Sequence, residues 1–492
     1  MDGYDYVVVG GGSAGCVLAT RLSENSDARV LMVEAGSGQV SETMATPGEW
    51  LSLRGGPLDW ADTTVRQSAL GKSVEWPRGR ALGGSSSING MVFARGHRSS
   101  YDAWAEYGAK GWGFDDLLPY FQRSERAEGR DPAVRGTDGP LVVKPAGQSH
   151  PTTAAAIEAA VEAGHGRAAD ISGGLEEGFG WVDLNIVDGK RQSVADAYLR
   201  PVLDRPNLTV VTDAVATGLR IDGDRCTGVE YSVGDQLLRA ECSGEVVLCA
   251  GAVGSAKLML LSGLGLADHL RQVGVDVVAD LPGVGTNLHD HPRFVLVYTA
   301  KQPVPAGAYN DIEAIGLARS DSSLTAPDVQ VFFMAPVPQE FGNGFMIGVS
   351  AITPRSRGQL RLSTSDPHAA PLLDPNYLGD SRDLEALIVG LNMAREIGQA
   401  SALVPWRDAE VVPGPGTDDR EFVRASIESY YHYAGTCRMG TDEMAVVDDD
   451  LRVRGLSGLR VADASVVPSV PSANTNATVV AIAERAAALI SG

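Results

Sequence analysis

The pattern of apolar and polar positions divides the chain into strand-like and helix-like segments. Short apolar runs at residues 6–9 and 30–33, with a helical pattern between them, predict a βαβ unit at the start of the chain. Residues 383–399 have the period of an amphipathic helix, whereas the Pro- and Gly-containing segment 401–420 predicts an exposed connection. Further strands, the last two in a second sheet, are expected at residues 207–220, 225–234, 245–251, 330–334 and 346–352.

The turn inside the first βαβ unit has the spacing of a dinucleotide-binding loop. Gly10, Gly12 and Gly15 match the pattern G-x-G-x-x-G between strand and helix. In such a loop the glycines allow a tight turn, close approach to a pyrophosphate and close helix–strand packing, and the first N–H groups of the helix face the phosphates. Glu34 ends the second strand, where an acidic side chain accepts from a ribose hydroxyl and disfavours a 2′-phosphate. We therefore expect a nucleotide-binding domain, built from separated segments and covered by a second domain.

Composition and charge narrow the class of protein. The 492 residues suffice for two or more domains, and the hydrophobic fraction of 44% and charged fraction of 21% are those of a soluble globular protein. A net charge of −21 argues against partners such as nucleic acid or an anionic membrane, because both require clustered Lys and Arg. The five scattered cysteines predict no structural disulfide. With a strand starting at once and no long apolar run, we expect a cytoplasmic protein without signal peptide or membrane span.

A second glycine-rich region, RGRALGGSSSINGMVFARG at residues 78–96, combines small residues with arginines. Arg side chains and backbone amides suit a pyrophosphate, although alone the segment equally fits a flexible surface loop. Residues 79–102 and residues 251–265 (GAVGSAKLMLLSGLG) resemble the two signatures of the glucose–methanol–choline (GMC) flavoprotein family, with Ala256 where the family usually has Pro or Ser. The resemblance continues to the last helix through residues 281–291 (LPGVGTNLHDH), His432 with GTCRMG, and residues 459–487.

This resemblance implies FAD as the cofactor and an α/β fold. It implies a Rossmann-like FAD-binding domain and a second, α+β substrate domain on an antiparallel sheet. The domains are expected to be discontinuous, with residues 1–145, 200–295 and 430–492 in the FAD-binding domain and residues 146–199 and 296–429 in the substrate domain. Several family members carry the flavin covalently on a histidine two residues after the serine pair of the first signature. Because Ile88 stands there, the FAD is expected to be non-covalent.

His432 and Asn474 match the catalytic pair of the family, a histidine in the pattern H-x-x-G-T and a His or Asn about forty residues later. The resemblance implies an alcohol dehydrogenase or oxidase that oxidises a CH–OH donor to the carbonyl. A neutral imidazole would accept the hydroxyl proton, and Asn474 would hold the alcohol oxygen for hydride transfer to flavin N5. Residues 474–476 also precede a helical pattern, whose dipole would face the flavin pyrimidine.

Other residues are expected to contact FAD because of their positions in these motifs. Asp463 resembles a family residue near the ribityl chain and phosphates. The remaining expected contacts are Gly10, Gly12, Ser13, Ala14, Gly15, Glu34, Ala35, Arg80, Gly83, Gly84, Ser85, Asn89, Gly90, Val215, Ala250, Gly251, Ala464, Thr475 and Asn476.

A histidine pair and a group of aromatic residues each have a structural interpretation as well as a functional one. His289 and His291 form an H-x-H pair, but no third ligand is evident and the segment resembles the N-L-x-D-H turn of the family, so no metal is expected. Aromatic residues near His432 suit a pocket wall as well as a core. We expect the substrate pocket to include Tyr431, Tyr433 and Phe333, with Tyr430 and Phe332 as further candidates.

Non-redox relatives supply the alternative functions. Fatty acid photodecarboxylases carry a cysteine where this chain has Ile352, and they lack the histidine found here at position 432. Hydroxynitrile lyases use histidines as acid and base, so Asn474 in place of a second histidine favours the redox reaction, and an FAD-containing lyase is the main alternative. The remaining alternative function is that of a binding module with a vestigial flavin.

The alcohol and the electron acceptor stay open. The acceptor is oxygen or another oxidant, since motifs do not encode how oxygen reaches a reduced flavin. Residues 300–327 are shorter than the lid-bearing insertions common in the family, which predicts an open site for a small-molecule alcohol, including a bulky one or a glycoside. No cage for a quaternary ammonium group is apparent, so choline is one candidate among several.

Overall fold

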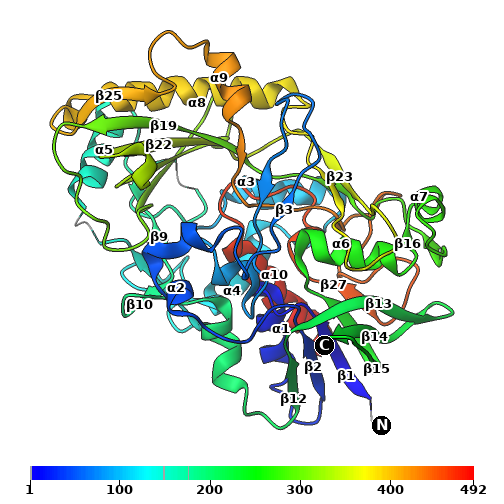
Figure 1. Cartoon of the computed structure of the whole chain (residues 1–492). Coiled ribbons are helices and arrows are strands. Elements are labelled where there is room, and N and C mark those ends of the chain that lie inside the picture. Colours follow the sequence, from blue (N-terminus) through cyan, green and yellow to red (C-terminus); the bar gives the residue numbers. More distant parts are fainter. Residues whose placement is uncertain (1–2, 148–149, 176) are drawn as a thin grey trace.

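The computed structural model describes residues 3–147, 150–175 and 177–492. Two seven-stranded sheets dominate it, one in each half of the molecule (Figure 1). The first has the order β12-β2-β1-β15-β14-β13, with β27 also paired to β15. The second has the order β25-β19-β22-β21-β20-β8, with β26 also paired to β19. The fold class expected from the sequence is therefore confirmed.

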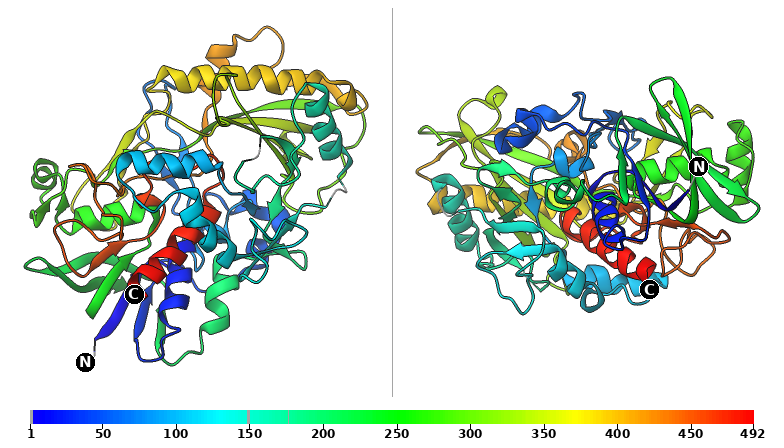
Figure 2. Two further views of the ribbon diagram at one scale, coloured as in Figure 1. Left: turned by 180° about the vertical axis from the view of Figure 1, so that it is seen from behind. Right: turned by 90° about the horizontal axis from the view of Figure 1, so that it is seen from below.

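The first sheet grows from the predicted βαβ unit. Its central strand β1 (Tyr4–Val9) lies parallel to β2 (Val30–Val33) on one side and to the end of β15 (Gln236–Leu248) on the other. The paired segments at residues 7–9, 31–33 and 246–248 are continuous apolar runs because parallel sheets are covered on both faces. Helix α1 (Ser13–Leu22) joins β1 to β2, and the C-terminal helix α10 (Asn476–Ser491) packs beside it, as both views in Figure 2 show.

The rest of this sheet comes from distant parts of the chain. Parallel pairing adds β12 (Leu208–Val211) at one edge and β27 (Leu459–Val461) beside β15. The antiparallel strands β13 (Ala214–Asp222) and β14 (Arg225–Val233) complete it. The single strand predicted for residues 207–220 is thus two strands, because Asp213 between them adopts a left-handed φ of +53°.

The second sheet is antiparallel throughout, as expected. Helix α8 (Ser381–Gln399) lies across one of its faces, and Gly390 permits the close approach because a Cβ there would lie 2.5 Å from Cγ1 of Val349. Helix α5 (Pro151–Glu162) also packs on this side. The strands are β8 (Gly178–Trp181), β19 (Pro292–Ala300), β20 (Ala314–Ala318), β21 (Val329–Met334), β22 (Gly344–Ala351), β25 (Arg407–Val412) and β26 (Glu428–Ser429).

One expectation for this region is wrong. Residues 401–420 do not form only an exposed connection, because they contain β25, the edge strand that pairs with β19. An edge strand has one solvated side, so the mixed sequence RDAEVV suits it, and Pro413 and Gly414 follow only after the strand has ended.

Smaller sheets connect the two halves. The four-stranded sheet β5-β9-β7-β6 combines β5 (Val92–Phe93), β6 (Glu125–Ala127), β7 (Leu141–Pro145) and β9 (Asp183–Leu184). The three-stranded sheet combines β18 (Thr286–Leu288), β23 (Gly358–Arg361) and β24 (Leu372–Asp374). Pairing in both sheets crosses the predicted domain boundaries, and β19 itself spans the boundary at residue 295. The chain therefore passes between the halves several times, and the halves share an extended contact.

Two further expectations concern the whole chain. No structural disulfide was expected, and all five cysteines are buried free thiols in the structure. Among the described residues, no helix combines the length and apolarity needed to cross a bilayer.

Candidate active site

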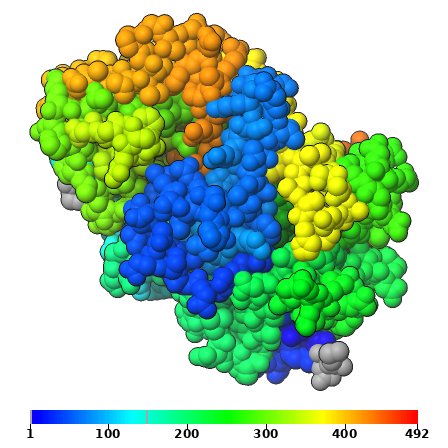
Figure 3. Space-filling model, in the orientation of Figure 1, coloured from blue at the N-terminus to red at the C-terminus, as the bar shows by residue number. Residues whose placement is uncertain are grey.

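A cavity of about 750 Å³ lies between the two halves. On one side it reaches the carboxyl ends of β1, β2 and β15, which is where open α/β sheets bind their ligands. On the other side it meets Arg293 and Val295 of β19 and Phe332 and Met334 of β21. Figure 3 shows a hollow on this face between the blue N-terminal segment and the green segment of the second sheet. The size and two-sided lining suit an extended cofactor together with a substrate.

Glycines leave room for a ligand on the first side of the cavity. A Cβ on Gly12 would meet nothing closer than 3.8 Å, and a Cβ on Gly251 would meet nothing within 4 Å. Gly84 faces Gly12 across the cradle, and a Cβ on it would lie 2.7 Å from the Cα of Gly12. Side chains at these positions would fill the cavity or force the two loops apart, so the cradle fits a group that lies against the bare backbone.

Three helices begin at this cavity, and none of them is capped by the side chain of its own N-cap residue. The N-cap residues are Gly12 for α1, Ala250 for α6 (Gly251–Leu261) and Thr475 for α10, and none of their side chains accepts a hydrogen bond from the helix. The first N–H groups of a helix need acceptors, and the positive end of each dipole favours a negatively charged group. FAD has a pyrophosphate and an electron-poor ring system, so these residues fit it.

Two acidic residues that line the cavity accept hydrogen bonds from other residues of the chain. Glu34 accepts hydrogen bonds from the N–H groups of Gly11 and Gly36, both at 2.6 Å, and burial raises its pKa to about 7 against the effect of these donors. Asp463 accepts from the N–H of Gly251 at 2.8 Å and from Ser255 Oγ at 2.5 Å, and it also binds Ser465. Both carboxyls line the cavity, and both hold the loops around it in place.

The cavity brings together nearly all of the expected cofactor residues. Gly15 and Gly83 are the exceptions, since neither lines it. Gly15 serves packing instead, because a Cβ there would lie 1.8 Å from the carbonyl oxygen of Gly10. Gly83 adopts a φ of +95°, which turns the chain into the short 3-10 helix at Gly84–Ser87.

His432 lies at the opposite end of the cavity, in a fixed environment. Its side chain is buried, and its Nε2 lies 3.2 Å from Nδ2 of Asn474. Burial lowers the pKa of His432 well below the ordinary value, and His291 and Arg293 lower it further. The imidazole is therefore neutral near pH 7. Asn474 Oδ1 is buried without a hydrogen-bond partner among the described residues, so this edge of the cavity offers an acceptor for a bound molecule.

His291 forms a hydrogen bond with the ring of His432. The two Nδ1 atoms lie 2.8 Å apart, so one ring must donate to the other. Burial lowers the pKa of His291 to about 3, and hence both rings are neutral. If His432 donates through Nδ1, its Nε2 keeps a lone pair on the cavity side, which agrees with the Asn474 amide donating to it. Sequence reasoning missed this role, although the N-L-x-D-H resemblance marks the segment.

The neighbouring residues of His291 position the same loop. Asp290 accepts the N–H of His432 at 2.8 Å and the hydroxyl of Ser429 at 2.6 Å, and burial raises its pKa to about 6. His289 contacts the carbonyl of Asn287 through Nδ1 and accepts the N–H of Val470 through Nε2. Among the described residues, no cluster of three or more His, Cys, Asp or Glu is placed to hold a metal ion.

The aromatic residues divide between the pocket and the core. Tyr431 and Tyr433 line the cavity as predicted, and Tyr433 stacks on Trp76 at 3.9 Å. The prediction for Phe333 is wrong: its ring faces Phe179 in the core, at 6.0 Å. Side chains alternate along a strand, so the preceding residue of β21 points into the pocket instead. The other residues of the wall are Phe332 and Tyr430, stacked at 5.3 Å.

Comparison with known proteins identifies the family. Sequence profiles described as GMC oxidoreductase match residues 4–293 and residues 354–483. Human mitochondrial choline dehydrogenase is 39% identical over 100% of this chain and 90% of that protein. Pyridoxine 4-oxidase from "Mesorbium loti" superposes with a TM-score of 0.95, at 35% identity over 99% of this chain and 98% of that chain. A formate oxidase of Aspergillus oryzae RIB40, described for its FAD modification, superposes with a TM-score of 0.91, at 27% identity over 100% of this chain and 98% of that one.

The glycine cradle generates a paired prediction. Gly15→Ala places a methyl group against the Gly10 carbonyl, so we expect the apo-protein to lose about 1–3 kcal/mol of stability and to unfold at a lower temperature. Gly12→Ala places the methyl group in the cavity, so we expect the unfolding temperature of the apo-protein to stay unchanged while FAD binds more weakly. Thermal unfolding and fluorescence titration with FAD measure both effects. Gly12→Ala protein that binds FAD as tightly as wild type would contradict this assignment of the cradle.

Proposed function

The chain belongs to the GMC oxidoreductase family, and on that premise we propose that it oxidises an alcohol to the carbonyl with His432 as the general base and non-covalently bound FAD as the cofactor. FAD-dependent alcohol oxidation in general follows from the family and from the named relatives. The base assignment rests on one observation: the neutral imidazole of His432 lies beside Asn474 on the wall of the cavity that fits the cofactor.

The pair of side chains accounts for the hydroxyl proton. An alcohol that takes the place of the Asn474 amide at His432 Nε2 donates its O–H to the lone pair there, and the Asn474 amide then donates to the alcohol oxygen. As the C–H bond breaks, the proton moves from the oxygen to Nε2, and the product is the aldehyde or ketone. Bound FAD supplies the acceptor for the hydride that leaves the carbon. Positioning by Asn474 and proton removal by His432 together contribute several powers of ten in rate.

The imidazolium that forms is stabilised little by its surroundings. Burial and the nearby Arg293 both disfavour charge on His432, so the ring is a weak base that releases its proton readily after turnover. His291 remains neutral and keeps accepting from Nδ1, which holds the ring in the same orientation before and after proton transfer.

The cradle residues would hold FAD without a covalent bond. Gly12, Ser13 and Ala14 at the start of α1 suit the pyrophosphate, and Thr475 and Asn476 at the start of α10 suit the electron-poor ring. Ile88 lines the cavity at the position where a tethering histidine would stand, and an alkyl side chain cannot form that bond.

The named relatives suggest classes of alcohol for testing. One is choline, a quaternary ammonium alcohol, and another is pyridoxine, a hydroxymethyl pyridine. The proposed substrate is a small-molecule alcohol, including a bulky one, and the oxidant that regenerates the cofactor is oxygen or another acceptor. Cytoplasmic localisation stays a prediction.

A direct test mixes the FAD-loaded protein with benzylic, primary and sugar alcohols under anaerobic conditions and follows the flavin absorbance. We expect at least one alcohol to bleach it, and His432→Ala to lower the bleaching rate by about 10²–10⁴-fold. The matched control is His165→Ala, a histidine that packs on Phe179 outside the cavity. Equal rates in wild type and His432→Ala protein would sink the base assignment, and cleavage of a cyanohydrin without bleaching would support a lyase.

The contact between His291 and His432 leads to a second prediction. His291→Asn keeps an oxygen that can accept from Nδ1 of His432, whereas His291→Ala removes every acceptor. We expect flavin reduction by an alcohol to slow about tenfold or more in the Ala variant and clearly less in the Asn variant. Stopped-flow absorbance on variants matched for flavin content measures this difference. The role in orienting His432 would be refuted by two variants with the same rate.

The mode of FAD attachment leads to a third prediction. Precipitating the holoenzyme with acid should release all of the flavin into the supernatant, because Ile88 offers no atom for a tether. Absorbance of the supernatant and the pellet gives the partition. Yellow colour that stays with the washed pellet would show a covalent bond to another residue.

A further inference from the structure

Two arginines converge on Tyr431 in the wall of the cavity. Arg54 Nη1 donates to the Tyr431 hydroxyl at 2.6 Å, and Arg293 Nη2 donates to the same oxygen at 3.0 Å. Both guanidinium groups also lie against the Tyr431 ring, at 5.7 and 5.5 Å from its centre. All three residues line the cavity that contains His432, so the cluster faces the same bound molecule.

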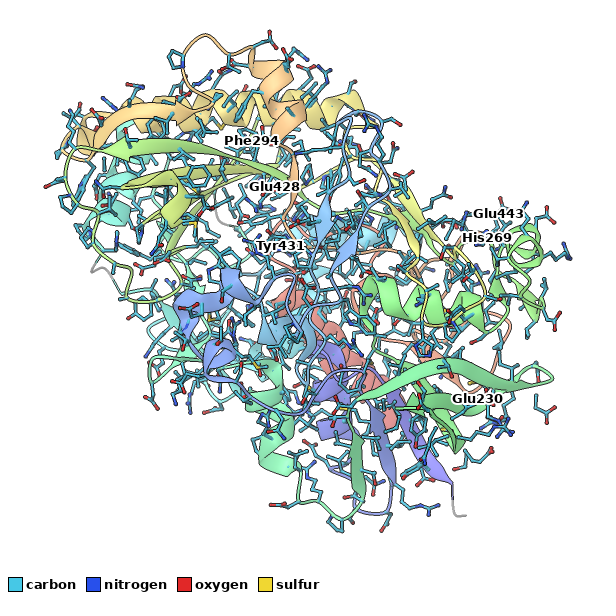
Figure 4. The ribbon with its side chains drawn as sticks, in the orientation of Figure 1. Glu230, His269, Phe294, Glu428, Tyr431 and Glu443 are labelled. Atoms are coloured by element: carbon cyan, nitrogen blue, oxygen red, sulfur yellow. The ribbon has the colours of Figure 1, made fainter. Side chains whose placement is uncertain are left out.

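These residues come from distant segments that meet only in the folded chain. Arg54 follows the short 3-10 helix at Pro47–Leu53, and Arg293 belongs to β19. Tyr431 adopts a left-handed φ of +66°, which is rare for an aromatic residue. Figure 4 shows Tyr431 and Glu428 close to the centre of the molecule, between the second sheet and the first half.

The positive charges of the cluster are only partly balanced. Glu428 pairs with Arg293 at 2.7 Å and is itself 55% exposed. Arg54 pairs with no carboxylate of the described residues, and its other hydrogen bond goes to the Leu51 carbonyl at 3.4 Å. Glu340 also lines the cavity, and its side chain is exposed at the rim. Two like charges directed at one neutral phenol repel each other, and an anion between them would relieve that repulsion.

We propose that Arg54, Arg293 and Tyr431 form a subsite for an oxyanion, and that the substrate is an alcohol that also carries a carboxylate or phosphate group. The inference rests on the proposed oxidation at His432. Guanidinium groups present paired N–H donors that match the geometry of both anions. Tyr431 and His432 both line the cavity, so one molecule can place its anion at Tyr431 and its reacting carbon at His432.

The same cluster disfavours a cationic substrate. A quaternary ammonium group has no donor or acceptor and is bound by aromatic faces and carboxylates. Here the two guanidinium groups beside the Tyr431 ring would repel a cation. The choline named for the human relative is therefore a poor match for this part of the cavity, despite the 39% identity.

Four alcohols on one frame test the subsite: benzyl alcohol and its para-carboxylate, para-phosphate and para-trimethylammonium derivatives. The measured quantity is kred/Kd, the rate constant for anaerobic reduction of the flavin in the holoenzyme divided by the dissociation constant of the alcohol. We expect an anionic alcohol to exceed the neutral one by about tenfold or more, and the cationic one to be the poorest. Comparison of the para-carboxylate with the para-phosphate alcohol shows which anion the subsite prefers. A preference for the neutral or cationic alcohol would overturn the proposal.

Substitutions of single arginines test which residue causes the preference for an anionic alcohol. Arg54→Met should remove most of the preference for the anion by raising Kd, and Arg54→Lys should restore part of it. Arg66→Met is the matched control, because Arg66 is exposed and lies outside the cavity lining. An anion preference that persists in Arg54→Met protein would refute the subsite.

A binding measurement separates this proposal from the oxidation itself. 4-Methylbenzoate carries the anion but no hydroxyl group, and its binding to the holoenzyme is measured by calorimetry. Binding of 4-methylbenzoate that weakens in Arg54→Met but not in Arg66→Met protein supports the subsite. This conclusion holds even if no alcohol bleaches the flavin, because that result contradicts only the proposed oxidation. Binding that is equal in both variants overturns the subsite even if neutral alcohols are oxidised.

Discussion

The buried carboxylate of Asp290 is the interaction on which the catalytic end of the cavity depends. It receives the backbone N–H of His432 and the hydroxyl of Ser429, and Tyr377 binds it as well. These donors come from two segments, residues 429–432 and Tyr377, so the Asp290 side chain fixes the loop that carries the base relative to the segment that contains His291 and leads into β19. Burial raises the pKa of Asp290 to about 6, and the surrounding donors oppose that rise by stabilising its charge. A chain that packed the two sheets but lost this carboxylate would present His432 without a defined orientation.

The cofactor end follows a different principle, because it is made of backbone. The N-termini of α1, α6 and α10, where the N-cap side chains accept no hydrogen bond, and the bare glycines nearby supply N–H groups and space. Carboxyls such as Asp463 hold these loops from behind. The two ends of the cavity thus differ: the first offers backbone N–H groups and space, and the second offers titratable side chains, among which His291 and His432 are kept neutral by burial.

The parts that sequence predicted well are local. The glycine loop, both strands of the first unit and the helix at α8 depend on neighbours within a few residues, and the structure confirms them. Side-chain facing in the second sheet depends on which strands pair, so Phe333 was expected in the pocket where Phe332 lies. The contacts of His432 with His291 and of Tyr431 with Arg54 join residues 141 and 377 positions apart, and no local pattern encodes them. The edge strand β25 was not predicted for a related reason, since it pairs with β19, a strand far away in the sequence.

In this cavity a carbon-bound hydrogen of the alcohol is expected to leave while His432 takes the hydroxyl proton. Anaerobic flavin reduction by an alcohol with deuterium on the carbinol carbon, compared with the undeuterated alcohol, tests this reaction. We expect the deuterated alcohol to reduce the flavin of the wild-type protein more slowly. If none of the alcohols reduced the bound flavin, or if their oxidation went on at full rate in His432→Ala protein, this reaction with His432 as base would be excluded.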